Sequence, residues 1–177
     1  DLHSFPTRRS SDLHIGARQK AGVIVDARII NTSSGAGLHG SLSQAAYSAA
    51  KGGIASLTLV QAAELKRYGI TANALAPAAR TRMTEGAFAD KMKRVEQGFD
   101  VQDPDNVAPA VVWLGSAHSA HVTGCVFWLE GGRIMLCDGW QDGPAIDKNA
   151  RWAPEEVGDA VSELLAKRRS QHSVWGT

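Results

Sequence analysis

The stretch "IINTSSGAGLHGSLSQAAYSAAKGGIASLTLVQAAELKRYGITANALAP", residues 29–77, decides the fold. Its β-branched start predicts a strand over residues 27–34, and the glycines that follow indicate a loop over residues 35–43. Helix-forming residues dominate from 44 to 68, and residues 70–77 predict a second strand that a proline ends. Two strands joined by a helix favour parallel pairing, so the stretch predicts an α/β domain.

The chain beyond this stretch continues the alternation. Helices are expected over residues 83–95 and 103–116, followed by a strand over residues 124–132. Residues 152–170 predict an amphipathic helix with basic residues at its C-terminal end. Upstream, the apolar run at residues 22–25 is too short to be assigned either to a strand or to a helix end.

The first residues do not match the rest. Residues 1–13, "DLHSFPTRRSSDL", show no helical or strand period and resemble the conceptual translation of a sequencing adapter, although a native flexible tail is the alternative. We interpret them as a non-native or disordered segment and expect the upstream half of the fold to be missing. Residues 14–139 are then expected to form the main domain, and residues 140–177 a C-terminal extension that carries the amphipathic helix.

The composition argues against several classes of protein. Nineteen Lys and Arg against eighteen Asp and Glu leave a net charge of +1, which gives no sign of nucleic-acid or membrane-surface binding. No apolar run approaches the roughly 20 residues that a membrane-spanning helix needs. Two cysteines form no disulfide framework. These features favour a cytoplasmic protein.

Tyr47 and Lys51 stand four positions apart, so a helix places both side chains on one face. A chance pair on a solvated helix surface is the ordinary explanation of such spacing. Ser34, however, ends the first predicted strand thirteen residues before Tyr47. Because side chains at the carboxyl ends of parallel strands face the ligand crevice, we expect a hydroxyl, a phenol and an ammonium to converge there.

These three groups suit proton transfer to or from an alcohol. A free phenol has a pKa of about 10, and a nearby cation favours the phenolate. A serine hydroxyl can donate a hydrogen bond to a carbonyl oxygen on which negative charge builds. None of the three groups accepts a hydride, so such a site needs a redox cofactor.

The spacing Ser-x12-Tyr-x3-Lys, the Asn before the serines and the "ITANALAP" run together resemble the short-chain dehydrogenase/reductase family. The resemblance covers roughly residues 22–136. It implies a Rossmann-like, doubly wound parallel sheet, of which residues 14–139 would be the catalytic half. The runs "RMT", "VAPAVVWLGS" and "GCVFWLEGG" look most like the (3R)-hydroxyacyl-CoA dehydrogenase unit of multifunctional enzyme type 2 and its bacterial relatives.

The resemblance also implies roles for single residues. Tyr47 would be the catalytic acid/base, Lys51 would lower its pKa and bind the nicotinamide ribose, and Ser34 would orient the substrate carbonyl. Pro77, Ala78 and Thr81 would line the cofactor. The family usually has Gly where this chain has an alanine after the proline, and the threonine is one residue closer than usual, as in the multifunctional-enzyme branch.

The implied cofactor is NAD or NADP, and no residue chooses between them. We expect no G-x-G-x-x-G type segment in this chain, of the kind that forms the Gly-rich phosphate turn in the first half of the fold and binds such a cofactor. The implied function is interconversion of a secondary alcohol and a ketone, with a 3-hydroxyacyl thioester or a steroid-like molecule as candidate substrate. The alternative is a truncated, non-catalytic fragment with at most an association role, and we expect the chain alone to be inactive and partly molten.

The expected partners are a small-molecule substrate and further copies of the same chain, with no nucleic acid and no membrane. The resemblance implies a dimer or tetramer in which the helix that carries Tyr47 pairs with its copy. The many alanines of that helix suit close approach of two helices, although packing against the sheet would also explain them.

Other residues leave alternatives open. His118, His121, Cys125 and Cys137 have a spacing too loose to favour a zinc site, so no metal is expected. His39 either touches substrate or is a solvated loop residue, the second being favoured. Arg80 and Arg82 either meet phosphates or are solvated. Trp113 and Trp128 are predicted to be core residues, and Trp140 either closes over substrate or packs the tail, the second being favoured.

Overall fold

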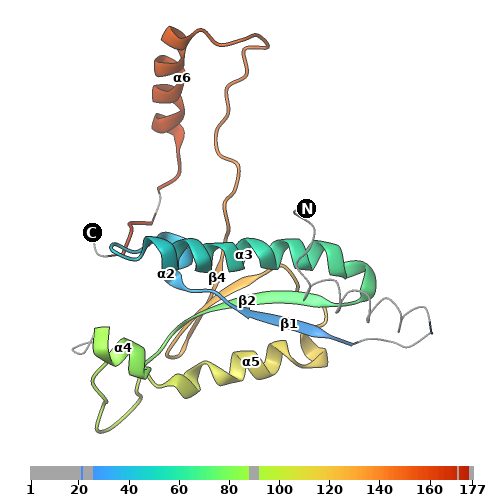
Figure 1. Cartoon of the computed structure of the whole chain (residues 1–177), viewed down its shortest axis with the longest axis vertical. Helices are drawn as coiled ribbons and strands as arrows, with labels where there is room; N and C mark the ends of the chain where they lie inside the picture. Colours follow the sequence, from blue (N-terminus) through green and yellow to red (C-terminus); the bar gives the residue numbers. More distant parts are fainter. Residues whose placement is uncertain (1–20, 22–25, 88–91, 171, 176–177) are drawn as a thin grey trace.

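A computed structural model describes residues 21, 26–87, 92–170 and 172–175 (Figure 1). The expectations for residues 1–13 and 22–25 lie outside these ranges. The element order among the described residues is strand, helix and strand, followed by short helices, a β-hairpin and a distant C-terminal helix. No helix in these ranges is long and apolar enough to cross a membrane.

The sheet has four strands in sequence order: β1 (Arg28–Thr32), β2 (Thr71–Ala78), β3 (Val126–Glu130) and β4 (Arg133–Cys137). The pairs β1–β2 and β2–β3 are parallel, whereas β3 and β4 form an antiparallel hairpin. The expected strands at residues 27–34, 70–77 and 124–132 therefore form, with ends shifted by one or two residues. The parallel core of the sheet follows from the long connections between β1, β2 and β3.

The middle strand β2 is covered on both faces. Residues 71–76 are all buried, as expected for a central parallel strand between helix layers. On one face Leu75 packs with Leu129 and with Leu114 of helix α5 (Ala108–Leu114), and these three side chains form the best-buried apolar cluster among the described residues. Helix α3 (Ala45–Leu65) covers the other face (Figure 1).

Helix α3 matches the predicted helix closely. It begins one residue after Gln44, continues as a 3-10 turn over Lys66–Tyr68 and ends at Gly69, whose φ of 72° is the left-handed conformation that glycine adopts most easily. Its first turns lie near the carboxyl end of β1, because the connection that returns the chain to the parallel strand β2 starts there. The helix therefore carries Tyr47 and Lys51 to that edge of the sheet.

The remaining helices are short, apart from the last. They are α2 (Gly35–His39), α4 (Arg82–Ala87), 3-10 turns at Pro104–Asn106 and Ala117–Ser119, and α6 (Pro154–Lys167). The turn before α5 begins as predicted at Asp103, whose carboxylate accepts the N–H of Asp105 at 2.9 Å, with Pro104 in the first turn.

Three expectations about local structure were wrong. The segment expected as a loop contains α2, because Ser34 caps a helical turn despite the glycines. Residues 92–95 are not helical, and the carbonyl groups of Met92 and Lys93 accept hydrogen bonds from a distant arginine. Strand β4 was not predicted, although its Gly131-Gly132 turn is a common two-residue hairpin signal.

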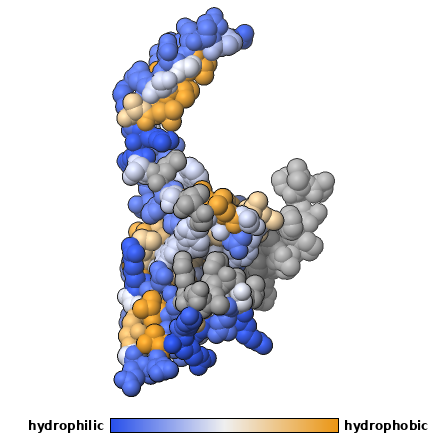
Figure 2. Space-filling model, turned by 90° about the vertical axis from the view of Figure 1, so that its left-hand side faces the viewer, coloured by the Kyte–Doolittle hydropathy of each residue, from blue (hydrophilic) through white to orange (hydrophobic). Residues whose placement is uncertain are grey.

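The chain after β4 leaves the sheet. Residues 138–153 are largely extended, and α6 stands clear of the sheet and of the other helices (Figure 1). Its apolar side chains gather along one side (Figure 2), and Val157, Val161 and Leu165 are all exposed there. Residues 172–175 then return to the end of α2. We call residues 138–170 the C-terminal arm and residues 172–175 the C-terminal tail.

Candidate active site

Tyr47 and Lys51 lie on the first two turns of α3, at the carboxyl end of β1. The Lys51 ammonium donates a hydrogen bond to the carbonyl oxygen of Thr32, the last residue of β1, at 2.9 Å. The same nitrogen lies 5.8 Å from the centre of the Tyr47 ring. Because the Tyr47 side chain is 44% exposed, its phenol is open to a ligand while a fixed positive charge stands beside it.

The end of β1 is tied to α3 by side chains that alternate along the strand. Ser33 donates its hydroxyl to the backbone carbonyl of Lys51 at 2.7 Å. Asn31 donates its amide to Thr58 Oγ1 at 2.9 Å and to Gln61 Oε1 at 2.8 Å. These bonds join residues 18 to 30 positions apart, so they fix the height of α3 along the strand. The relative position of strand end and helix start is thereby set by direct contacts.

Ser34 follows the strand at the same edge. Its backbone is extended, with φ of −163° and ψ of 153°, and its hydroxyl oxygen accepts the N–H of Ala36 at 3.3 Å as the N-cap of α2. The parallel register pairs Thr32 with Leu75, and the Ser33 N–H donates to the Leu75 carbonyl at 2.7 Å. Ser34 therefore stands level with the last residues of β2.

The predicted cofactor-lining residues occupy the neighbouring strand end. Pro77 and Ala78 are the last residues of β2 and pair with Leu129 and Glu130 of β3. Ala78 lies in extended backbone, and among the described residues only Ser43 and Asn149 combine a side chain with a positive φ. The alanine that replaces the usual glycine therefore causes no strain here.

Thr81 caps helix α4. Its N–H donates to Thr84 Oγ1 at 2.6 Å, and its own Oγ1 accepts the N–H of Thr84 at 3.2 Å. This reciprocal pair satisfies the first turn of α4 and fixes the chain that leaves β2. The hydroxyl of Thr81 is thus engaged locally, in an exposed position beside the strand end.

The glycines after Ser34 correct one expectation. Gly35, Gly37 and Gly40 have the spacing G-x-G-x-x-G after a strand, so such a segment does occur in the chain. A Cβ on Gly37 would lie 2.5 Å from the backbone nitrogen of Gly52, so this glycine lets α2 and α3 touch. A Cβ on Gly35 would lie 2.2 Å from the Trp175 ring. Gly35 and Gly37 therefore allow close packing within the chain. Other residues of the chain fill the space beside them, where a phosphate would have to bind.

Arg80 is neither solvated nor free to meet a phosphate. It is 7% exposed, and its guanidinium pairs with Asp100 and donates to the carbonyls of Met92 and Lys93, each at 3.3 Å. The hydrogen bond between the two side chains raises the pKa of Arg80 and lowers the pKa of Asp100 below its usual value. Both alternatives stated for Arg80 are wrong, while Arg82 is exposed.

The histidine and tryptophan residues considered as alternatives also differ from expectation. His39 is half-buried and stacks on His172, with ring centres 4.4 Å apart, so it is not a solvated loop residue. Trp113 is 43% exposed on α5 and is not part of the core, and Trp140 is 96% exposed, so it packs nothing. Trp128 is half-buried, against His39 and Trp175. Its packing depends on the returning tail.

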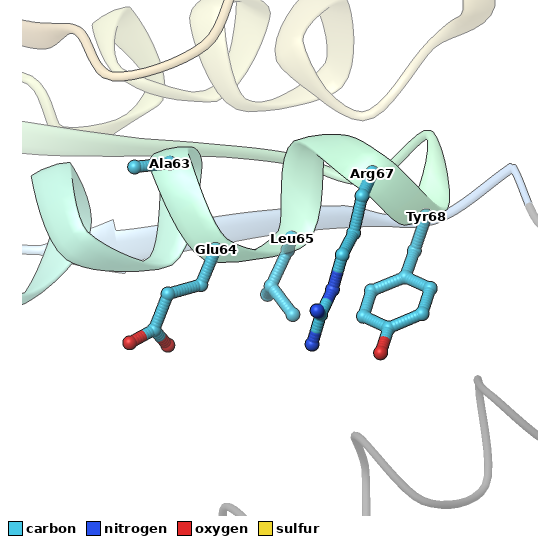
Figure 3. A pocket seen from close by; sticks show the side chains of 5 residues that line it. All are labelled: Ala63, Glu64, Leu65, Arg67 and Tyr68. Atoms are coloured by element: carbon cyan, nitrogen blue, oxygen red, sulfur yellow. The ribbon is translucent and has the colours of Figure 1, made fainter.

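A surface recess of about 430 Å³ lies at the C-terminal end of α3, whereas Tyr47 is in its first turn. Figure 3 shows its labelled lining side chains projecting from the last turns of the helix: Ala63, Glu64, Leu65, Arg67 and Tyr68. None of the groups discussed above lines this recess. Within the part of the chain that the structure describes, no three His, Cys, Asp or Glu side chains are grouped so as to hold a metal ion.

Comparison with known proteins decides the family. The model of a family described as enoyl-(acyl carrier protein) reductase matches residues 16–133. A solved short-chain dehydrogenase from Mycobacterium avium is 54% identical, superposes with a TM-score of 0.83, and is matched over 98% of this chain and 56% of its own. The chain belongs to the short-chain dehydrogenase/reductase family. Both the predicted family and the predicted Rossmann-like α/β class are confirmed.

This short-chain dehydrogenase/reductase is also similar to curated relatives. Hydroxyacyl-CoA dehydrogenase ChsB1 of Mycobacterium tuberculosis is 36% identical over 91% of this chain and 51% of its own length. The peroxisomal hydratase-dehydrogenase-epimerase of Neurospora crassa is 37% identical over 60% of this chain and 11% of its own. The chain thus spans about half the length of its M. tuberculosis and M. avium relatives. The family is one of oxidoreductases.

Proposed function

We propose that this chain carries the proton-transfer half of a nicotinamide-dependent oxidoreductase, which interconverts a secondary alcohol and a ketone on a 3-hydroxyacyl thioester. The observation that carries the proposal is the Lys51 ammonium, held by the end of β1 and placed 5.8 Å from the Tyr47 ring, with Ser34 at the same edge. The substrate class is supported by the names of the relatives, a hydroxyacyl-CoA dehydrogenase and a hydratase-dehydrogenase-epimerase.

The residues at this edge fit the nicotinamide end of such a cofactor. An ammonium has three N–H donors, and the Thr32 carbonyl takes one of them, so donors remain for the hydroxyls of a ribose. Pro77 and Ala78 end the adjacent strand and offer a backbone wall beside that position. When bound, NAD or NADP would supply the hydride acceptor or donor that these side chains lack.

Tyr47 would hold and move the proton. In the oxidation direction its phenolate oxygen would take the proton of the substrate hydroxyl, while the carbon that bears this hydroxyl would lose its hydride to the nicotinamide, and a ketone remains. The positive charge of Lys51 stabilises the negative charge on that oxygen before the transfer. In the reduction direction the phenol returns the proton to the oxygen of the former ketone.

Ser34 would orient the substrate. Its hydroxyl already accepts the Ala36 N–H and keeps its own hydrogen available for donation to the substrate oxygen. This hydrogen bond strengthens as negative charge builds on the oxygen during reduction. The three side chains then act on a single atom, the oxygen of the alcohol or ketone.

The test is turnover of Tyr47→Phe in a chimaera, in which the upstream part of the M. avium relative is joined in front of residues 27–177 of this chain. With a 3-hydroxyacyl-CoA and NAD or NADP, kcat is expected to fall by about 10²–10⁴-fold while cofactor affinity stays within about threefold. Tyr68→Phe, at the other end of α3, is the matched control and leaves kcat unchanged. A Tyr47→Phe variant within a few-fold of the parent would contradict the assignment.

A calorimetric titration separates this proposal from a non-catalytic fragment. We expect the 177-residue chain to bind NADH or NADPH undetectably and the chimaera to bind with micromolar affinity. A chimaera that binds the cofactor but turns over no secondary alcohol would favour the association role. Micromolar binding by the chain alone would instead give it a cofactor site of its own.

We also propose that the enzyme self-associates through α3. Ala45, Ala46, Ala49 and Ala50 are all exposed on its first turns, and such small side chains allow a second helix to approach closely. Light scattering on the chimaera is expected to give a dimer or tetramer. A monomer at micromolar concentration would contradict this arrangement.

A further inference from the structure

The C-terminal tail binds the segment that follows Ser34. The N–H of Trp175 donates to the Gly40 carbonyl at 3.3 Å, and the N–H of Leu42 donates to the Trp175 carbonyl at 2.9 Å. Trp175 also forms a parallel bridge with Ser41. The tail is therefore held by backbone pairing as well as by side-chain contact, more than 130 positions along the chain from its partner segment.

The ring of Trp175 enters an aromatic cluster under this segment. Its centre lies 5.1 Å from the Trp128 ring, edge to face, and 6.3 Å from His39. His39 in turn stacks on Trp128 at 5.5 Å and on His172 at 4.4 Å. The cluster therefore joins three parts of the chain, namely α2, β3 and the tail.

Gly35 is where this cluster meets the candidate active site. A Cβ on Gly35 would lie 2.2 Å and 2.5 Å from Trp175 ring atoms and 2.6 Å from a Trp128 ring atom. The two indole rings thus pack directly against the backbone of Gly35, the residue after Ser34. Ser34 owes its orientation to the same turn, because its hydroxyl accepts the N–H of Ala36 within it.

We propose that Trp175 is a positioning residue for Ser34. Its indole packs against Gly35 and holds the turn Ser34–Ala36 in place, so the docked tail determines where the serine hydroxyl points. This inference rests on the role proposed for Ser34. It assigns to the tail a part in catalysis that the exposed arm before it does not share.

The first experiment measures docking without reference to activity. In the chimaera, amide hydrogen exchange is followed for peptides that cover residues 34–42. Trp175→Ala is expected to speed exchange there by about tenfold or more, since the backbone pairing with the tail is lost. The matched control is Trp140→Ala, which removes an indole that is 96% exposed and leaves exchange unchanged. Unchanged exchange in Trp175→Ala would overturn the docking.

The second experiment asks whether docking acts through Ser34. Trp175→Ala is expected to lower kcat by about tenfold with little change in the KM for the cofactor, and Trp175→Phe to recover most of the loss. The double variant Ser34→Ala/Trp175→Ala is expected to be no slower than Ser34→Ala alone, because both changes remove one interaction. Losses that multiply would show that the tail acts elsewhere and would overturn the proposal.

The two ideas fail in distinguishable ways. If Ser34→Ala leaves kcat unchanged, the proposed role of the serine is wrong, whatever exchange shows. If Ser34→Ala lowers kcat but Trp175→Ala does not, while the tail is released, the serine role stands and the positioning role is wrong. A thermal melt of each variant confirms that it is folded, and Trp175→Phe provides the measurement if the alanine variant is not.

Discussion

The edge of the sheet at β1 and α3 and the C-terminal arm are held in opposite ways. At the sheet edge, Asn31, Ser33 and Lys51 make hydrogen bonds to residues 18 to 30 positions away. In the arm the side-chain bonds join residues of the arm itself: Lys167 meets Glu163 at 2.6 Å, the Ala153 N–H donates to Glu156 at 2.7 Å, and Arg169 donates to Gln141 at 3.1 Å. Bonds within the arm can stabilise it without fixing where it lies on the domain.

The contrast indicates which side chains of this protein are held in fixed positions. The proton transfer proposed for this edge needs a phenol, an ammonium and a hydroxyl placed to within fractions of an ångström, and long-range bonds can supply such placement. The arm keeps an apolar face exposed and is connected to the domain at its two ends, β4 and the tail (Figure 1). Substitutions in the two regions should therefore have effects of very different size.

Lys51→Met is expected to have the largest effect. It removes the charge beside Tyr47 and the bond to Thr32 together, so kcat in the chimaera should fall by about 10²-fold or more and the cofactor Kd should rise about tenfold. Stopped-flow turnover and calorimetry measure the two effects. Lys66→Met, at the far end of α3, is the matched control. A normal cofactor Kd in Lys51→Met would contradict the ribose role.

Asn31→Ala compared with Val161→Ala tests the contrast in stability. Asn31 loses two hydrogen bonds at 2.9 and 2.8 Å, and the free energy of unfolding should fall by about 1–3 kcal/mol, because Thr58 is fully buried. Val161 is exposed on α6, so its truncation should change the value by less than about 0.5 kcal/mol. Urea unfolding of the chimaera measures both. Equal losses of unfolding free energy in the two variants would contradict the contrast between the sheet edge and the arm.

The attachment of the tail should depend weakly on pH. Burial lowers the pKa of His39 below 6.5 in the docked state, and a charge on His172 lowers it further. Docking of the tail favours the neutral form of His39. The attachment of the tail is therefore strongest above the ordinary pKa of about 6.5 and weakens as pH falls below that value. The titratable neighbour seen in this cluster is His172, since Trp128 and Trp175 do not titrate.

Tryptophan fluorescence and exchange of residues 34–42 between pH 8 and pH 5 measure this attachment. His39→Phe keeps a ring in the stack but cannot take up a proton, so the dependence should become shallower. Equal docking of the tail at pH 8 and pH 5 in the parent protein would contradict the predicted coupling between His39 and the tail.

The sequence predicted the parts that depend on local pattern. The strands β1 and β2 and the helix α3 follow from β-branched runs and from a long run of helix formers stopped at Gly69. The spacing of Ser34, Tyr47 and Lys51 predicted that they would share one edge, and the structure places them there. The short helix α2 does not follow from the pattern, because its glycines indicate a loop, whereas Gly37 allows contact with α3.

Other features depend on contacts between distant residues, which no local pattern reveals. The sequence predicts that Arg80 meets phosphate or solvent, yet it forms an ion pair with Asp100, twenty positions away. The docking of Trp175 on Gly35 joins opposite ends of the described chain. The Gly131-Gly132 turn is a usable sequence signal for β4, but a single strand predicted over residues 124–132 hides it.

The claim that Tyr47 and Lys51 act as one unit is tested most directly by a double-mutant cycle on kcat at saturating cofactor. Turnover of the chimaera is compared with that of Tyr47→Phe, Lys51→Met and the double variant. If the ammonium acts on the proton through the phenol, the double variant should be within about threefold of the slower single variant. Losses that multiply would show two independent contributions, and the pairing of these side chains at the end of β1 would not be the source of the chemistry.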